Sequence, residues 1–180
     1  MPLEIERKWL IDTDKLPFSL EGAEHHHIVQ SYLSFSPQVR LRAIDDARFI
    51  MTIKGKSKET DSPLVREERE FELTRETYLE LRAKTEGRTI AKTRYVVPES
   101  CENAQASDDA RVFEIDVFEG DFSGLVMAEM EFASIEEAES YPVPSWAVLD
   151  VSEDMRYRNV AMAQSDDPSL VFQGMKENAG

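Results

Sequence analysis

The sequence predicts a β-dominated α+β fold in which one sheet closes into a barrel with a charged interior. Seven short segments of the chain place charged residues at alternate positions. Side chains i, i+2 and i+4 share one face of a strand, so each segment would carry a charged face backed by an apolar or mixed face. A single strand of this kind is ordinarily an exposed edge or a solvated sheet face. Seven of them in one chain favour a closed sheet, because charged faces that converge on an interior can surround water, ions or a charged ligand.

The seven segments lie between residues 4 and 132. EIERK begins the series with Glu4, Glu6 and Lys8 at alternate positions. The alternating residues of the other six segments are Arg40 and Arg42, Lys54 and Lys56, Glu68, Glu70 and Glu72, Lys92 and Arg94, Glu114 and Asp116, and Glu129 and Glu131. Nearly half of the basic residues of the chain fall in these segments. An anionic ligand in the interior would explain that distribution.

Helix signals occur at three places. Thr74 is a suitable N-cap for a helix that would run through RETYLELRAKTE and stop at Gly87. Ser134 and Glu137 form the pattern of a capping box for a short second helix. A third start is indicated at Ser152, where acidic residues occupy the first turn before MRYRNVAMAQ. We expect these helices to pack outside the barrel.

The chain is expected to form one domain. A length of 180 residues fits a single unit with a real core. Two polar stretches, residues 55–65 and 98–111, have the composition of loops. We therefore predict a single domain over residues 1–164, followed by a C-terminal tail over residues 165–180.

The chain is also strongly acidic, with 21 Lys and Arg against 36 Asp and Glu and a formal charge of −15. This argues against nucleic acid as a partner, because binding to a phosphate backbone needs a basic surface. No apolar run is long enough to span a bilayer, and no basic and apolar leader precedes EIERK, so we expect no membrane partner. The lone Cys101 is compatible with a reducing cytoplasm, which is the expected location. A homodimer through the outer face of the barrel is compatible with the sequence, although nothing in the sequence specifies one.

The predicted lining combines two kinds of ligand chemistry. Hard cations such as Mg²⁺ and Mn²⁺ prefer carboxylate oxygens and bind substrate phosphates through their remaining positions. Arginine offers phosphate oxygens a planar fork, and lysine offers a compact point charge. The candidate metal ligands are Glu4, Glu6, Asp116, Glu129 and Glu131, and the candidate phosphate ligands are Arg40, Arg42, Lys54, Lys56, Lys92 and Arg94. Together they describe a metal and polyphosphate site at which an activated water can attack phosphorus.

The opening EIERK resembles the ExExK signature of the CYTH superfamily, the triphosphate tunnel metalloenzymes. Further segments resemble successive family segments in the family's order, namely QSYL (30–33), VRLR (39–42), TIKGK (52–56), EREFEL (68–73), KTRY (92–95), FEIDVFEG (113–120), AEMEF (128–132) and SEDMRYRN (152–159). The ordered series extends from about residue 3 to about residue 160, which makes chance a poor explanation. The resemblance implies an eight-stranded antiparallel barrel with a charged tunnel. That tunnel would bind a linear triphosphate with Mg²⁺ or Mn²⁺, at two ions per site.

The resemblance also assigns roles by motif position. One metal ion would be held by Glu4, Glu6 and Glu131, and a second by Asp116 and Glu129. Phosphates would be held by Lys8, Arg40, Arg42, Lys54, Lys92 and Arg94. The basic residues would be kept in place by Glu68, Glu70 and Glu114. Arg156 would close one mouth of the tunnel.

A lysine activates water in this family, and a lysine among arginines can have a depressed pKa through like-charge repulsion. Lys92 is the first candidate for this role and Lys8 is the second. For each of them the alternative role is a fixed phosphate contact that keeps its proton. The sequence does not separate the two roles.

Short connections between the motifs resemble those of the bacterial inorganic triphosphatases. The sequence therefore favours hydrolysis of inorganic triphosphate (tripolyphosphate) to diphosphate and phosphate. A class IV type adenylyl cyclase and a thiamine triphosphatase are the alternatives within the family, but a cyclase must recognise adenine, and no nucleobase pocket is evident in the sequence. An alternative of another class is a non-catalytic module that binds polyphosphate or a nucleotide. Such a module could dispense with Asp116 or Glu129, whereas catalysis with two metals needs both ions held.

Overall fold

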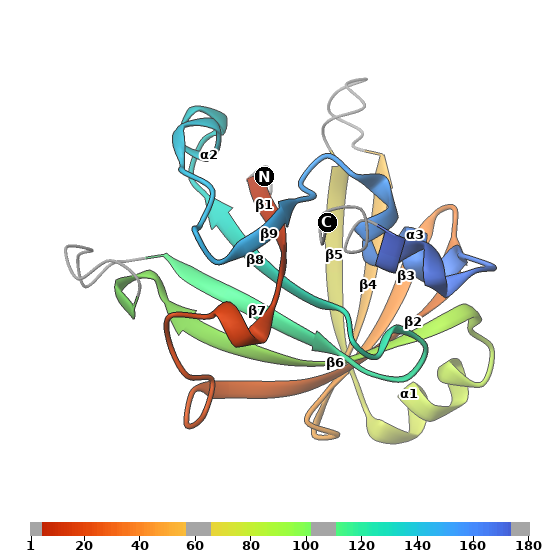
Figure 1. Cartoon of the computed structure of the whole chain (residues 1–180). Coiled ribbons are helices and arrows are strands. Elements are labelled where there is room, and N and C mark those ends of the chain that lie inside the picture. The colour runs from red at the N-terminus through yellow and green to blue at the C-terminus, as the bar shows by residue number, and fades with distance from the viewer. Residues whose placement is uncertain (1–4, 57–65, 102–110, 174–180) are drawn as a thin grey trace.

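The chain folds around one antiparallel sheet, in a computed structural model that describes residues 5–56, 66–101 and 111–173 (Figure 1). This part of the chain contributes nine strands to the sheet. From one edge to the other they are β5 (Arg66–Leu73), β4 (Arg48–Lys56), β3 (Gln38–Ile44), β2 (Glu24–Phe35), β6 (Glu86–Pro98), β7 (Val112–Phe118), β8 (Val126–Phe132), β1 (Ile5–Ile11) and β9 (Ala147–Asp150). The prediction of a β-dominated α+β fold is confirmed.

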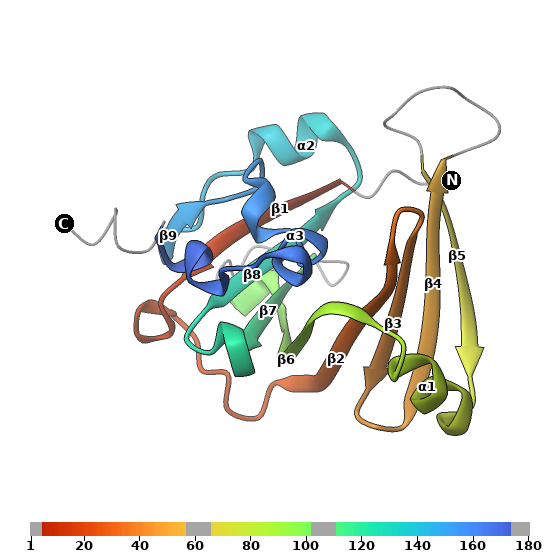
Figure 2. The same ribbon diagram turned by 90° about the vertical axis from the view of Figure 1, so that its right-hand side faces the viewer.

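The predicted closed barrel is not confirmed. β5 and β9 form the two edges of the sheet, and no hydrogen-bonded pairing joins them within the described residues. The sheet is strongly curved, with β3, β4 and β5 on one side and β1, β8 and β9 on the other (Figure 2). It has nine strands where eight were predicted, because β9 adds to the free edge of β1. Alternating charges specify which side chains share a face, but they do not specify which strands meet at the edges.

The charged residues of neighbouring strands lie on one face of the curved sheet, which we call the inner face. Residues directly opposite one another on antiparallel strands share a face. Lys8 on β1 and Glu114 on β7 both lie opposite Glu129 on β8. Arg94 on β6 lies opposite Asp116 on β7. The alternation in these segments therefore corresponds to a continuous charged surface, as the sequence predicted.

Two helices, α1 (Arg75–Arg82) and α2 (Ile135–Ser140), cover the opposite face, which we call the outer face. Tyr78 of α1 packs on Phe49 of β4, with ring centroids 4.8 Å apart. Ala138 of α2 belongs to a buried cluster that contains Trp9 of β1 and Phe113 of β7. These strand residues alternate with the charged residues of the inner face. The prediction that helices pack outside the sheet is confirmed for these two.

Both outer helices begin where the sequence predicted. Thr74 Oγ1 accepts a hydrogen bond from the backbone N–H of Thr77 at 3.2 Å, and Ser134 Oγ accepts one from the backbone N–H of Glu137 at 3.1 Å. These bonds satisfy N–H groups that have no partner within the helix. Among the described residues, no helix has both the length and the apolar character needed to cross a membrane.

Gly87 does not end α1 as predicted, because α1 ends at Arg82 and Gly87 lies near the start of β6. Its φ of +70° lies in the left-handed region that favours glycine. A Cβ atom at this position would lie 2.4 Å from the carbonyl oxygen of Ala163 and 2.8 Å from Cζ of Phe35. Gly87 therefore allows β6 to approach α3 (Asn159–Gln164) more closely than any other residue would.

The segment after Ser152 differs most from the prediction, which was a single helix on the outside. Asp154 instead accepts a hydrogen bond from the backbone N–H of Arg156 and starts a 3₁₀ turn, η4 (Met155–Tyr157). The helix α3 begins only after that turn. A further 3₁₀ helix, η5 (Pro168–Phe172), falls within the stretch predicted as a C-terminal tail.

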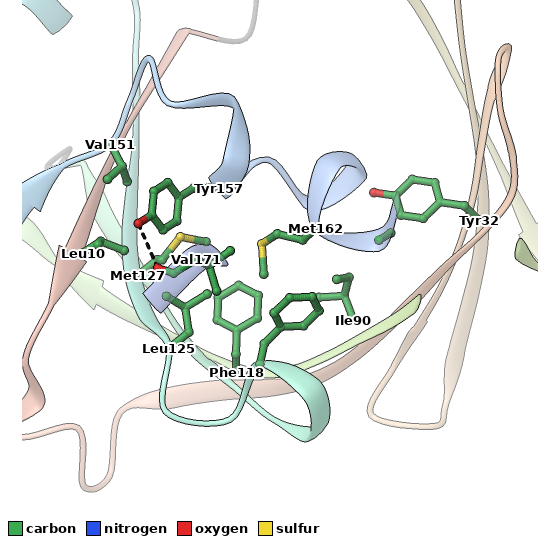
Figure 3. Close-up of a cluster of buried hydrophobic side chains, with 12 residues drawn as sticks. Leu10, Tyr32, Ile90, Phe118, Leu125, Met127, Val151, Tyr157, Met162 and Val171 are labelled. Carbon is green, nitrogen blue, oxygen red and sulfur yellow. Dashed lines mark hydrogen bonds between the residues drawn. The ribbon is translucent and has the colours of Figure 1, made fainter. Parts of the chain in front are cut away.

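These C-terminal elements pack on the inner face, which corrects the predicted outside position of the third helix. Tyr157 of η4 joins a buried cluster with Ile90 of β6 and Met127 of β8 (Figure 3). Ile90 is two residues from Lys92, and Met127 is two residues from Glu129, so the apolar cluster and the charged residues share one face. We call this apolar group the inner cluster. It covers one end of the inner face and leaves the charged residues at the other.

Candidate active site

A network of buried ion pairs joins β1, β6, β7 and β8 on the inner face. Arg94 donates hydrogen bonds to both carboxylate oxygens of Asp116 at 2.7 Å and to Glu129 at 2.9 Å. Lys92 donates a further bond to Asp116, and Lys8 donates one to Glu129 at 2.9 Å. Asp116 is 0% exposed and Lys92 is 2% exposed. The network therefore holds three cations and two carboxylates together largely out of water.

Burial and ion pairing shift the pKa values in this network in different directions. Burial raises the pKa of Glu129, but Lys92, Lys8 and Arg94 together outweigh it and hold this pKa at about 2. Burial lowers the pKa of Lys92 below its ordinary value, and Arg94 adds to that effect while Asp116 opposes it. Burial also acts to lower the pKa of Lys8, but its carboxylate neighbours outweigh it and raise this pKa. Of the two lysines predicted as the general base, only Lys92 is shifted toward the neutral form.

Three more basic residues line the inner face on β3 and β4, and two of them are paired with glutamates of β5. Arg40 donates a hydrogen bond to Thr52 Oγ1 at 3.2 Å and lies 3.5 Å from Glu68. Lys54 lies 3.0 Å from Glu68. Glu70 accepts a bond from Thr52 at 3.1 Å and lies 3.8 Å from Arg40. Glu68 and Glu70 thus contact the basic residues that they were predicted to keep in place.

The third of these residues, Arg42, interacts with residues on both β2 and β6. Its Nη2 donates a hydrogen bond to Oε1 of Gln30 at 3.3 Å. Burial, followed by the charges of Arg40 on the same strand and Arg94 on β6, lowers its pKa to about 10. The basic residues of β3 and β6 therefore act on one another across the curved sheet. A chain of phosphates placed between them would relieve this repulsion.

A cavity of about 320 Å³ lies beside the network and is lined by Glu6, Arg111, Val112, Glu114, Glu129, Met130 and Glu131. Four glutamates in this lining suit the chemistry of a hard divalent cation. Lys8 Nζ lies 3.1 Å from Glu6 and 2.9 Å from Glu129, so its ammonium group holds the position between these two carboxylates. Within the described ranges, no three acidic, histidine or cysteine side chains form a group that could hold a metal ion. The donor types fit the predicted metals, and ligation by the full predicted set stays a prediction.

Most of the predicted site residues come together on the inner face, but three need separate mention. Glu4 lies outside the described residues, and Lys56 is placed only as part of the backbone of β4. Arg156 is exposed on η4, where its guanidinium donates to Asp154 at 2.6 Å. Its predicted position at a tunnel mouth stays a prediction. Glu114, by contrast, accepts a hydrogen bond from Arg94, the type of contact that was predicted for it.

Sequence analysis did not single out Gln30, Thr52 or Arg111. Gln30 and Thr52 are 0% exposed, and both bond to a basic residue of the inner face. Thr52 lies two residues before Lys54 on β4 and therefore shares its face, so the two-residue period of the strand could have placed Thr52 on the inner face. Gln30 carried no such signal, because the residues two positions away are Ile28 and Tyr32. Arg111 was not found because it ends a polar stretch that was predicted to be a loop.

No family model matches the chain. An inorganic triphosphatase from Nitrosomonas europaea is 34% identical to it over 167 residues, which cover 90% of this chain and 97% of that protein. The chain belongs to the CYTH-like inorganic triphosphatase family. A second family member, the inorganic triphosphatase of Acetivibrio thermocellus, is 29% identical over 162 residues, covering 88% of this chain and 92% of that protein. A crystal structure of an inorganic triphosphatase is similar to the present fold with a TM-score of 0.66 and 32% identity, and the match covers 93% of this chain and 98% of that one. The resemblance to this triphosphatase family is confirmed.

Proposed function

We propose that this protein hydrolyses inorganic triphosphate to diphosphate and phosphate, with Mg²⁺ or Mn²⁺ bound on the inner face. The observation that carries the proposal is the joint placement of basic residues and buried carboxylates on one face of a chain that is 34% identical to an inorganic triphosphatase. A phosphoryl transfer needs little more than positioning and neutralisation of charge. The cytoplasmic location and the homodimer expected from the sequence stay predictions.

The phosphates of the substrate would lie between the two groups of cations. Arg40, Arg42 and Lys54 face them from β3 and β4, and Lys92 and Arg94 face them from β6. The pKa of Arg42 is already lowered by Arg40 and Arg94, so these guanidinium groups repel one another when no anion lies between them. Binding of a polyanion would remove this repulsion and favour the predicted contacts. Lys8 and Lys56 complete the predicted set of phosphate ligands.

The metal ions would be held at the acidic end of the inner face. Glu6, Glu129 and Glu131 line the cavity there, whereas Asp116 is not part of that lining and forms ion pairs with Lys92 and Arg94. Glu4 would complete the predicted donors. When bound, Mg²⁺ or Mn²⁺ would neutralise negative charge on the phosphate oxygens.

Lys92 is the first candidate to take a proton from the attacking water, and Lys8 is the second. The water oxygen would form a bond to the terminal phosphorus, the bond from that phosphorus to the diphosphate oxygen would break, and the released proton would pass to the lysine. Lys92 lies among phosphate-binding residues, and its burial favours the unprotonated form that a base requires. The alternative role, a fixed contact to phosphate, predicts weaker substrate binding after its removal.

The proposal is tested by incubating the purified protein with tripolyphosphate, ATP and thiamine triphosphate, each with Mg²⁺ or Mn²⁺. Phosphate, diphosphate and cyclic AMP are then quantified. Rapid release of phosphate from tripolyphosphate, and its loss after chelation of the metal, is the expected result. Cyclic AMP from ATP would reassign the protein to the cyclases, and no turnover of any substrate would reassign it to a binding module.

The role of Lys92 is tested with Lys92→Met and the control Lys84→Met, which removes an exposed lysine after α1. A general base contributes roughly 10²- to 10⁴-fold to the rate, so Lys92→Met should lower kcat by about that factor with little change in tripolyphosphate affinity. A large loss of affinity at nearly unchanged kcat would assign Lys92 to phosphate binding instead.

A further inference from the structure

Arg42 differs from the other described basic residues of the inner face in its partners. The others, Lys8, Arg40, Lys54, Lys92 and Arg94, each form an ion pair with at least one glutamate or aspartate. Among the described residues, Arg42 forms no ion pair with a carboxylate, and its Nε has no hydrogen-bond partner. Its positive charge is therefore left largely without compensation inside the fold.

The surroundings of Arg42 make its uncompensated charge energetically unfavourable while no ligand is bound. Burial, Arg40 and Arg94 lower the pKa of Arg42, and Glu70 opposes them only in part. A half-buried cation that lacks a carboxylate partner is ordinarily unfavourable, so the arrangement suits a site whose anionic partner arrives from solution.

Gln30 is the residue that holds Arg42. It lies directly opposite Arg42 in the pairing of β2 with β3, and its side chain is 0% exposed. Oε1 of Gln30 accepts from Nη2 of Arg42 at 3.3 Å, and Nε2 of Gln30 donates to the hydroxyl oxygen of Tyr32 at 2.8 Å. Because a guanidinium group can only donate, the amide oxygen must face Arg42. Tyr32 belongs to the inner cluster, so the amide is anchored on its far side.

We propose that Gln30 is a positioning residue for substrate binding, whose neutral amide holds Arg42 in place while leaving the guanidinium charge available to a phosphate group. The proposal rests on the proposed function, since Arg42 serves the same triphosphate site. A glutamate at position 30 would have nearly the same shape, but it would pair with Arg42 and compete with the substrate for it. The choice of an amide over a carboxylate would thus set the affinity for the anion.

The test compares Gln30→Glu and Gln30→Met with the wild type. Gln164→Glu is the matched control, since it makes the same change of charge at an exposed residue of α3. Binding of tripolyphosphate is measured by calorimetry in the presence of a chelator, and KM and kcat are measured separately with Mg²⁺. We expect Gln30→Glu to weaken binding by about tenfold or more and Gln30→Met by about threefold, in line with charged and neutral hydrogen bonds. KM should rise with kcat less affected, and Gln164→Glu should bind as the wild type does.

Wild-type affinity in Gln30→Glu, or equal losses in Gln30→Glu and Gln30→Met, would overturn the proposal. The same substitutions in an Arg42→Met background complete a double-mutant cycle. There they should weaken binding no further, and an undiminished effect would show that Gln30 acts independently of Arg42. If Gln30→Glu fails to fold, the cycle with Gln30→Met still decides whether Gln30 acts through Arg42, and an undiminished effect of Gln30→Met in the Arg42→Met background overturns the proposal. Because calorimetry with a chelator needs no turnover, it tests Gln30 even if the wild-type protein proves not to be a triphosphatase.

Discussion

Substitution of Gly87 by alanine should destabilise the protein through a clash that no other described glycine with positive φ would suffer. The new Cβ would lie 2.4 Å from the carbonyl oxygen of Ala163 and 2.8 Å from Cζ of Phe35. The oxygen belongs to the backbone of α3, so relief requires α3 to move away from β6. Gly22 provides a matched control, because its φ of +78° is similar and a Cβ there would meet nothing within 4 Å.

The expected magnitudes follow from these two environments. Placing a residue with a Cβ in the left-handed region costs about 1–2 kcal/mol, and this strain applies to both Gly87→Ala and Gly22→Ala. Overpacking typically adds about 1–3 kcal/mol, and it applies to Gly87→Ala alone. The free energy of unfolding should therefore fall by roughly 2–5 kcal/mol in Gly87→Ala and by roughly 1–2 kcal/mol in Gly22→Ala.

The assay is equilibrium unfolding in urea, followed by circular dichroism, with the free energy taken by linear extrapolation. The reasoning would be refuted if Gly87→Ala were destabilised no more than Gly22→Ala. That outcome would mean that α3 can shift at little cost, and that the contact between β6 and α3 does not determine the position of the C-terminal segment.

Three further substitutions test the ion pairs and the inner cluster. Asp116→Asn removes the fully buried carboxylate between the buried Lys92 and the half-buried Arg94 and should lower the free energy of unfolding by about 3–5 kcal/mol, measured in urea. A loss below about 1 kcal/mol would show that the cations find other partners. Tyr157→Phe removes a hydrogen bond of 2.9 Å to a backbone carbonyl of η5 (Figure 3) and should cost about 1 kcal/mol in the same assay; an unchanged value would mean that water replaces the bond. Burial raises the pKa of Asp150, but hydrogen bonds from Ser152 and Arg7 outweigh it and hold this pKa below 3.8. The Asp150 carboxylate therefore stabilises the folded protein fully at a pH above its ordinary pKa, and this stabilisation is lost as the pH falls through the lower pKa of the folded state. Because Asp150→Asn lacks this carboxylate, its free energy of unfolding should fall less than that of the wild type between about pH 6 and about pH 3. Parallel pH profiles of the two proteins would contradict this.

The sequence determined the face on which each charge lies. Side chains in a strand alternate with a period of two, so the spacing alone places Lys92 with Arg94 on one face of β6, and Glu114 with Asp116 on one face of β7. The starts of α1 and α2 were predictable for a related reason, because an N-cap bond joins residues three positions apart. Interactions over such short separations depend on the local chain alone.

Only the tertiary structure decided how distant segments meet. The pattern of charges gave no information on the edges of the sheet, so a closed barrel was predicted where the described strands leave β5 and β9 unpaired with each other. The third helix was predicted on the outside, but the apolar ends of β6 and β8 on the inner face bury it there. Gly87 has the spacing of a helix stop, but its role depends on a contact with α3, which is far from it in the chain.

The candidate site divides in the same way. The charged side chains were recognisable from their alternation, whereas Gln30 became visible only through its buried contact with Arg42 on the neighbouring strand. A neutral residue acquires such a role from what lies opposite it, and that partner is set by strand register. The sequence thus determined which chemistry lines the inner face. The tertiary structure decided which charges are compensated there, because compensation depends on distances between residues that only folding brings together.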